Sequence, residues 1–358
     1  MGLTLFLVII IAIGFDFTNG FHDTANSIAT MVGTRALDPR VAVAYAAALN
    51  FVGALAGTEV AATVGKGIIE AKADMATLNV VLAGLVGAIT WNLVTWLFGL
   101  PSSSSHALIG GLVGAAVAQG ATPVLWSGVT EKVLIPSLVA PVLGLVGGLV
   151  LMAILMQLTR GMNPRTGNTL FRRLQIFSGG WLSFTHGLND AQKTMGIMML
   201  ALIAAGHLDP AVVDPPFWVK VSAASAMCLG TYAGGWTIIK TLGGKIVKMS
   251  PMQGFSASTA GAAILMFGER HGMPVSTTHV VTGCVLGAGS AKRLSSVRWT
   301  VAGDIVTAWV MTLPAAAAVG AVAYGVTSIH PLVLVTAATG SLLFMRHRVN
   351  AKGLAVSH

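Results

Sequence analysis

Residues 16–29 read Asp-Phe-Thr-Asn-Gly-Phe-His-Asp-Thr-Ala-Asn-Ser-Ile-Ala, and residues 183–196 read Ser-Phe-Thr-His-Gly-Leu-Asn-Asp-Ala-Gln-Lys-Thr-Met-Gly. Phe, Thr, Gly and Asp coincide in register between the two segments. A second pair matches at residues 99–106 and 272–279, where Gly-Leu-Pro-Ser-Ser-Ser-Ser-His stands against Gly-Met-Pro-Val-Ser-Thr-Thr-His. Because the pairs occur in the same order with a nearly constant offset, the chain is predicted to be an internal duplication.

The composition around these motifs is strongly apolar. Of the 358 residues, 54% are hydrophobic and only 9% are charged, with a mean hydropathy of +0.79, whereas a soluble domain carries about 25% charged residues. Apolar stretches long enough to cross a hydrocarbon layer of about 30 Å recur along the chain, at 41–60, 77–98, 134–158, 217–239, 299–324 and 328–345. We therefore expect an all-α polytopic membrane protein with about 10–12 transmembrane or re-entrant helices.

Equivalent loops of the two repeats carry opposite charge. After the first motif Arg35 and Arg40 flank Asp38, whereas the equivalent loop of the second repeat carries Asp209 and Asp214 without Lys or Arg. Because positively charged loops stay on the cytoplasmic side, the two repeats are predicted to be inverted in the membrane. The formal net charge of +9 is assigned to such loops and not to nucleic-acid binding.

The domain organisation follows from the repeats and from a basic stretch between them. Residues 159–174 contain four arginines and are predicted to form a cytoplasmic linker. The N-terminal repeat with its following helix is expected over 1–158, the C-terminal repeat over 175–298, and a C-terminal helical hairpin with a tail over 299–358. The two cysteines have no metal-type spacing, so neither a disulfide nor a cysteine metal site is expected.

The first motif of each repeat contains an acid within an apolar segment. Asp23 and Asn26 are three residues apart, as are Asp190 and Lys193, so each pair shares one face of a helix. An ionised carboxylate in hydrocarbon costs at least about 2.5 kcal/mol, and it usually faces a cavity or a partner. A structural Asp190–Lys193 pair is the alternative, but it does not explain Asp23. His22 is a further candidate for titration near neutral pH, and the glycines before each acid predict a break in both helices.

The second motif of each repeat predicts a helix start lined by hydroxyl groups. Such a start leaves several backbone N–H groups unpaired and carries the positive end of the helix dipole, so it can hold an anion without arginine. An ordinary helix cap explains one copy, but two copies in register favour an anion site. The candidate residues are Ser103, Ser104, Ser105, Ser276, Thr277 and Thr278. His106 and His279 close the two segments and are expected to support the cradle by hydrogen bonding.

These motifs resemble the inorganic phosphate transporter (PiT) family over roughly residues 10–345. The resemblance implies a membrane-embedded secondary transporter built from inverted repeats, which moves phosphate together with a cation, and neither an enzyme nor a cofactor-dependent protein. Matched by motif, the cation-linked residues would be Asp23, Asn26 and Asp190, which are also the only suggested metal site, for Na⁺. The six hydroxyl residues would form the phosphate cradle.

Lys193 departs from the pattern of the sodium-coupled members, which have asparagine at this position. A fixed ammonium group would compete with Na⁺, pair with Asp190 or neutralise phosphate. The variant is similar to the bacterial low-affinity phosphate permeases, regarded as proton-coupled, which carry free phosphate or a metal–phosphate complex. We therefore expect H⁺-coupled symport, with Asp23 and Asp190 as proton sites, His22 as a lesser one and Lys193 beside them. Na⁺ coupling and sulfate transport stay open, as does a homo-oligomer.

Other functional classes fit the sequence less well. Serine and histidine in a membrane suggest a protease, but no Gly-x-Ser-x-Gly segment surrounds Ser102–Ser105, and catalysis would not require the duplication. A passive anion channel remains an alternative that accumulation of the anion against its gradient would exclude. The expected location is a bacterial cytoplasmic (inner) membrane, crossed many times by the chain.

Overall fold

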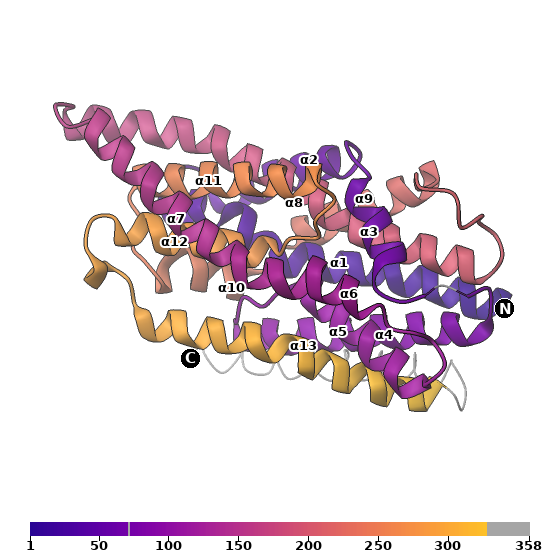
Figure 1. Cartoon of the computed structure of the whole chain (residues 1–358). Coiled ribbons are helices and arrows are strands. Elements are labelled where there is room, and N and C mark those ends of the chain that lie inside the picture. Colours follow the sequence, from indigo (N-terminus) through magenta and orange to yellow (C-terminus); the bar gives the residue numbers. More distant parts are fainter. Residues whose placement is uncertain (71, 328–358) are drawn as a thin grey trace, which may run out of the picture.

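The computed structural model describes residues 1–70 and 72–327, and this part of the chain is helical with no β-strand. Figure 1 shows most of the long helices running side by side along the long direction of the molecule. Two isolated antiparallel bridges, Ile69–Val124 and Val247–Val297, occur at corresponding places in the two halves. They pair the segment after a short helix with the segment before a long one in each half.

The helices follow the same order in both halves. The first half contains α1 (Gly2–Gly33), α2 (Pro39–Ala54), α3 (Glu59–Gly67), α4 (Met75–Phe98), α5 (Ser104–Gln119), α6 (Trp126–Val129), η1 (Thr130–Leu134) and α7 (Ile135–Leu158). The second half contains α8 (Pro164–Ala204), α9 (Phe217–Ala233), α10 (Trp236–Lys240), η2 (Thr241–Lys245), α11 (Pro251–Arg270), α12 (Thr277–Ser290), η3 (Leu294–Ser296) and α13 (Trp299–Thr327).

Helices of the first half pack against helices of the second half. Helix α1 packs on α9 and α8 packs on α2, while α5 packs on α13 and α12 packs on α7. Each of these contacts joins the first half to the second, and each has its counterpart in the other direction. This reciprocal arrangement is compatible with the predicted inverted repeat, and it buries α1 and α8 at the centre of the molecule.

Not every helix is long enough to cross a bilayer. In the described residues, α1, α4, the continuous stretch Trp126–Leu158 and α13 are long and apolar enough, and α2 with α3 forms a further candidate bent by 73°. Helices α5 and α12 have 16 and 14 residues, so they extend only about 24 and 21 Å at 1.5 Å per residue. Each packs on the helix before it, so α4–α5 and α11–α12 form hairpins whose second arm is too short to cross a bilayer by itself.

The predicted break in the helices that carry the two acids is wrong. Helix α1 is continuous over 32 residues and α8 over 41 residues. The glycines before the acids permit close helix contacts instead. A Cβ atom on Gly20 would lie 2.5 Å from the carbonyl oxygen of Met227 in α9, and one on Gly187 would collide with the backbone of Asn50 in α2. Small residues at helix crossings allow such close packing in membranes.

Most of the predicted linker between the repeats is helical. Asn163 caps α8 by accepting the N–H of Arg165 at 2.9 Å, and Pro164 occupies the first helical position. Residues 164–174 of the predicted linker are therefore the beginning of α8. At the other end, α13 covers the first part of the predicted C-terminal hairpin, and residues 328–358 lie outside the described part of the chain.

Candidate functional site

The first turns of α5 and α12 meet at the centre of the molecule. Ser103 caps α5 by accepting the N–H of His106 at 3.2 Å, and Ser276 caps α12 by accepting the N–H of His279 at 3.3 Å. The two histidine rings lie 4.7 Å apart, which shows how closely these helix starts approach each other. Two positive helix ends therefore converge, and the structure brings together the two segments that the sequence predicts as an anion cradle.

Within each half, a hydroxyl group of the cradle donates to the acid of the same half. Ser104 Oγ donates to Asp23 Oδ2 at 2.9 Å, and Thr277 Oγ1 donates to Asp190 Oδ1 at 3.1 Å. All four side chains are buried. The acids on α1 and α8 are thus held against the starts of α5 and α12, and a change in the charge of either acid acts directly on the cradle.

Between the halves, the residue three positions after each acid reaches the opposite cradle. Asn26 Nδ2 donates to Thr278 Oγ1 at 2.9 Å, and Lys193 Nζ donates to Ser105 Oγ at 2.5 Å. Both contacts use the last hydroxyl residue of the opposite segment, in keeping with the symmetry of the two motifs. Asn26 and Lys193 therefore each hydrogen-bond to a cradle residue of the opposite half.

Lys193 is held by three oxygen atoms. Its Nζ lies 2.5 Å from Asp190 Oδ1, 2.5 Å from Ser105 Oγ and 3.2 Å from the carbonyl oxygen of Val275. The side chain is only 3% exposed. A buried ammonium group is stable only when it is paired and hydrogen-bonded in this way. The contacts resemble the oxygen environment of a small bound cation, and here the chain supplies that cation itself.

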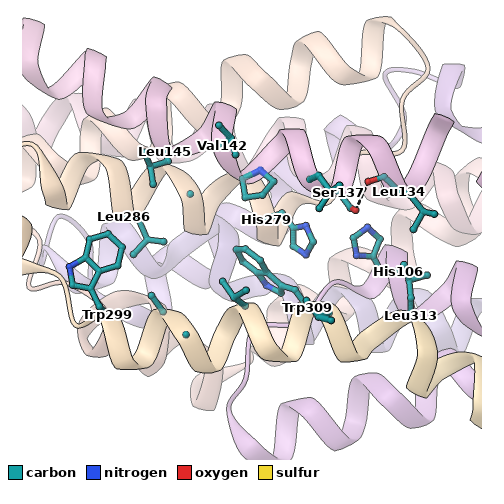
Figure 2. A pocket seen from close by; sticks show the side chains of 17 residues that line it. His106, Leu134, Ser137, Val142, Leu145, His279, Leu286, Trp299, Trp309 and Leu313 are labelled. Atoms are coloured by element: carbon teal, nitrogen blue, oxygen red, sulfur yellow. Dashed lines mark hydrogen bonds between the residues drawn. The ribbon is translucent and has the colours of Figure 1, made fainter. Parts of the chain in front are cut away.

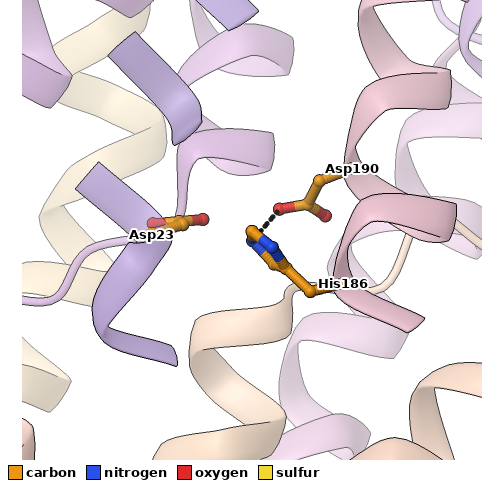
Figure 3. A group of neighbouring side chains, drawn as sticks. All are labelled: Asp23, His186 and Asp190. Carbon is orange, nitrogen blue, oxygen red and sulfur yellow. Dashed lines mark ion pairs between the residues drawn. The ribbon is translucent and has the colours of Figure 1, made fainter. Parts of the chain in front are cut away.

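His186 of α8 lies close to both acids. Asp23, His186 and Asp190 each offer an atom to a cluster in which these atoms lie within 4.8 Å of one another (Figure 3). His186 Nε2 lies 3.3 Å from Asp190 Oδ2, and its Nδ1 lies 3.1 Å from Asn50 Oδ1. Two carboxylates and an imidazole are donors that can hold a metal cation. The sequence reasoning missed His186, although it precedes Asp190 by one helical turn in the same motif.

His22 lies on the other side of Asp23. Its Nδ1 is 2.7 Å from Asp23 Oδ1, and its Nε2 is 3.1 Å from Thr95 Oγ1. The ring is buried. His22 therefore orients the carboxylate of the first half.

Asp16 is a second residue that the sequence reasoning missed. It lies seven residues, or two helical turns, before Asp23 on the same face of α1. Its side chain is fully buried, and neither carboxylate oxygen has a hydrogen-bond partner among the described residues. Asn19 and Thr194 are the polar side chains beside it. The spacing from Asp23 was the signal that could have identified this further buried acid.

The rings of His106 and His279 do not support the cradle as predicted. Only their backbone N–H groups bond to the capping serines. Neither nitrogen of the His279 ring has a hydrogen-bond partner in the described part of the chain. Its ring packs 4.2 Å from Trp309 of α13. Figure 2 shows both imidazoles facing the space between α7 and α13, because the side chains of the third helical position point away from the hydroxyl face.

Comparison with known proteins agrees with this geometry. The model of the phosphate transporter family matches residues 19–320. Similar curated proteins include those of Mycobacterium leprae, Rhizobium meliloti and Bacillus subtilis, each named "Probable low-affinity inorganic phosphate transporter". They are 51%, 49% and 46% identical to this chain over 90%, 88% and 89% of its length, and over 79%, 94% and 95% of their own lengths.

A solved structure has the same fold. The protein described as "The sodium-dependent phosphate transporter" superimposes with a TM-score of 0.84 and 27% sequence identity, covering 92% of this chain and 100% of that one. The family and these relatives are transporters and not enzymes. The apolar helices and the bacterial relatives indicate a multi-pass protein of the inner membrane. The chain belongs to the phosphate transporter family.

Proposed function

We propose that this protein takes up inorganic phosphate by H⁺ symport, with the anion held at the starts of α5 and α12. The cradle offers the hydroxyl groups of Ser104, Ser105, Thr277 and Thr278 and the unpaired backbone N–H groups of two helix ends. Such an arrangement binds a tetrahedral oxyanion through hydrogen bonds and helix dipoles. Ser103 and Ser276 contribute by fixing the two helix starts as caps.

The charges of the site support coupling to a cation. Asp23 and Asp190 bring two negative charges, and Lys193 brings one positive charge. A buried site with a surplus negative charge repels an anion unless a cation enters with it. Phosphate therefore binds best when one acid is neutralised, and this requirement links the movement of the anion to that of the cation.

The position of the Lys193 ammonium group is the observation that favours H⁺ over Na⁺ as the coupling ion. Its ammonium group already occupies the oxygen atoms beside Asp190, so a Na⁺ ion there would meet a fixed positive charge. Among the described residues Asp23 bonds to Ser104 and His22 and has no lysine or arginine partner, and it is the acid that we assign to the transported proton. A carboxylate can carry a proton only if its affinity changes between the outward-open and inward-open states. Opening this site to one side and then the other supplies that change.

The cluster of Asp23, His186 and Asp190 favours a second candidate cargo. Its nitrogen and oxygen donors suit a divalent cation, so a metal–phosphate complex is the alternative substrate. Na⁺ coupling at Asp23, Asn26 and Asp190 and transport of sulfate are the remaining alternatives. Phosphate is protonated near neutral pH and can donate a hydrogen bond to Asp23 or Asp190, whereas sulfate cannot.

Uptake of radiolabelled phosphate by proteoliposomes tests these alternatives. The pH gradient, Na⁺ and Mg²⁺ are varied separately, and unlabelled sulfate is added as a competitor. We expect accumulation driven by an inward H⁺ gradient, without Na⁺ or Mg²⁺, and resistant to sulfate. Uptake that ignores the pH gradient and requires Na⁺ would contradict the assignment of the proton. A strict requirement for Mg²⁺ would favour the metal–phosphate complex.

A further inference from the structure

A cavity of about 740 Å³ lies between α7 and α13, outside the polar site described above (Figure 2). Most of its wall consists of aliphatic and indole side chains from these two long helices. His106 of α5 and His279 of α12 form its floor, and none of the described residues that line it is charged. The floor is therefore the reverse side of the two helix starts that form the phosphate cradle.

The floor has hydrogen-bonding capacity that the protein itself does not use. Three ring nitrogens have no hydrogen-bond partner in the described residues: Nδ1 of His106 and both nitrogens of His279. Both side chains are more than nine-tenths buried. The other polar groups of the wall are engaged: Trp309 Nε1 donates to the carbonyl oxygen of Pro101 at 3.0 Å, and Ser137 Oγ donates to that of Leu134 at 2.6 Å.

The polarity of the floor limits what can bind there. A neutral imidazole presents one donor and one acceptor, whichever nitrogen carries the proton. A hydroxyl group both donates and accepts, so it can bond to one ring nitrogen of His279 whichever nitrogen carries the proton. A phosphate or carboxylate head would bring an unpaired charge into a cavity without a counterion, at a cost of several kcal/mol.

The walls indicate where the occupant comes from. Leu138 of α7 and Val310 of α13 line the cavity, and they are 74% and 68% exposed at the outer surface of the molecule. Both belong to segments long and apolar enough to span a membrane, so these side chains face lipid. The cavity is consequently open to molecules dissolved in the hydrocarbon layer.

We propose that this cavity binds a single-chain lipid with an uncharged hydroxyl head. The alkyl chain lies between α7 and α13, and the hydroxyl group hydrogen-bonds to the ring of His279. Because His279 directly follows Thr278 and Trp309 bonds to Pro101, the bound lipid contacts the back of both cradle segments. The binding itself does not depend on which cation accompanies phosphate.

Photolabelling of the full chain in phospholipid nanodiscs tests the proposal. One probe is a long-chain primary alcohol with a diazirine at the chain end, and the other is an alkane of the same length with the same diazirine. We expect the alcohol to label α7 and α13 about tenfold more than the alkane, because one or two buried hydrogen bonds distinguish the probes. His279→Phe should reduce the alcohol labelling to that of the alkane and leave the alkane labelling unchanged.

His271→Phe is the matched control, since His271 is exposed at the end of α11 and does not line the cavity. It should leave the labelling by both probes unchanged. Equal labelling of the wild-type protein by both probes would assign the cavity to ordinary lipid tails and overturn the proposal, even if His279→Phe failed to fold. Absence of labelling of α7 and α13 by either probe would also overturn it.

Discussion

The two halves of the site have the same layout but differ in one charge. In the first half the residue three positions after Asp23 is Asn26, a neutral amide that bonds to Thr278. In the second half the equivalent residue is Lys193, whose ammonium group bonds to Ser105 and to Asp190. One half thus contains its own cation, and we propose that the other half takes its cation from solution. Three substitutions in the site test this difference, and a fourth outside the site serves as a control.

Asp190→Asn should have the largest effect, because it removes the partner of a buried ammonium group. Breaking a buried ion pair from one side costs about 3–5 kcal/mol, so we expect a lower melting temperature of the purified protein as well as loss of phosphate uptake. Thermal unfolding in detergent and uptake in vesicles measure the two effects. An unchanged melting temperature with normal uptake would show that the Asp190–Lys193 pair has no such role.

Asp23→Asn should abolish accumulation of phosphate driven by a pH gradient and leave stability nearly unchanged. Asp23 bonds to Ser104 and His22 and is not paired with a lysine, and asparagine resembles the protonated acid. We expect accumulation driven by a pH gradient to fall to the level of protein-free vesicles, while exchange of internal for external phosphate persists. Exchange and accumulation lost together would indicate a structural role, and normal accumulation would exclude Asp23 as the proton site.

Lys193→Asn makes the second half like the first. Asp190 then lacks its internal cation, and a cation from solution must replace it for phosphate to bind. We expect uptake without Na⁺ to fall about tenfold, as the loss of a charged hydrogen bond predicts, and added Na⁺ to restore part of it. Uptake that is unchanged and indifferent to Na⁺ would contradict the proposed role of the ammonium group.

Asp214→Asn should have the smallest effect and serves as a control outside the site. Its carboxylate in the loop before α9 bonds to Lys220 at 2.8 Å, and this contact lowers the pKa of Asp214. The stabilising effect of the pair is present above the usual pKa of aspartate and is lost as the pH falls through the lowered value. Because Asp214 is 68% exposed, we expect a change in stability below about 1 kcal/mol and normal uptake.

The sequence predicted which residues meet because polar motifs are rare in so apolar a chain. Asp23, Asp190 and the two hydroxyl segments could be selected on that basis, and the structure brings them together. The contacts of Asn26 and Lys193 with the opposite half could not be predicted, since they depend on how α1 and α8 pack between the two hairpins.

Other predictions about the site were wrong, and some residues were missed, for identifiable reasons. Glycines such as Gly20 suggested broken helices, but their effect is close packing, which only the neighbouring backbone reveals. The direction in which His279 points depends on the rotation of α12 within the bundle. Asp16 and His186 lie at helical spacings from the two acids, and this periodicity would have identified both.

Proton entry during phosphate uptake tests the asymmetry of the two halves most directly. A pH-sensitive dye inside Na⁺-free proteoliposomes records acidification when phosphate is added outside, with the membrane potential held at zero. The account predicts acidification in the wild-type protein and none in Asp23→Asn. Uptake of phosphate without acidification, or only together with Na⁺, would contradict it.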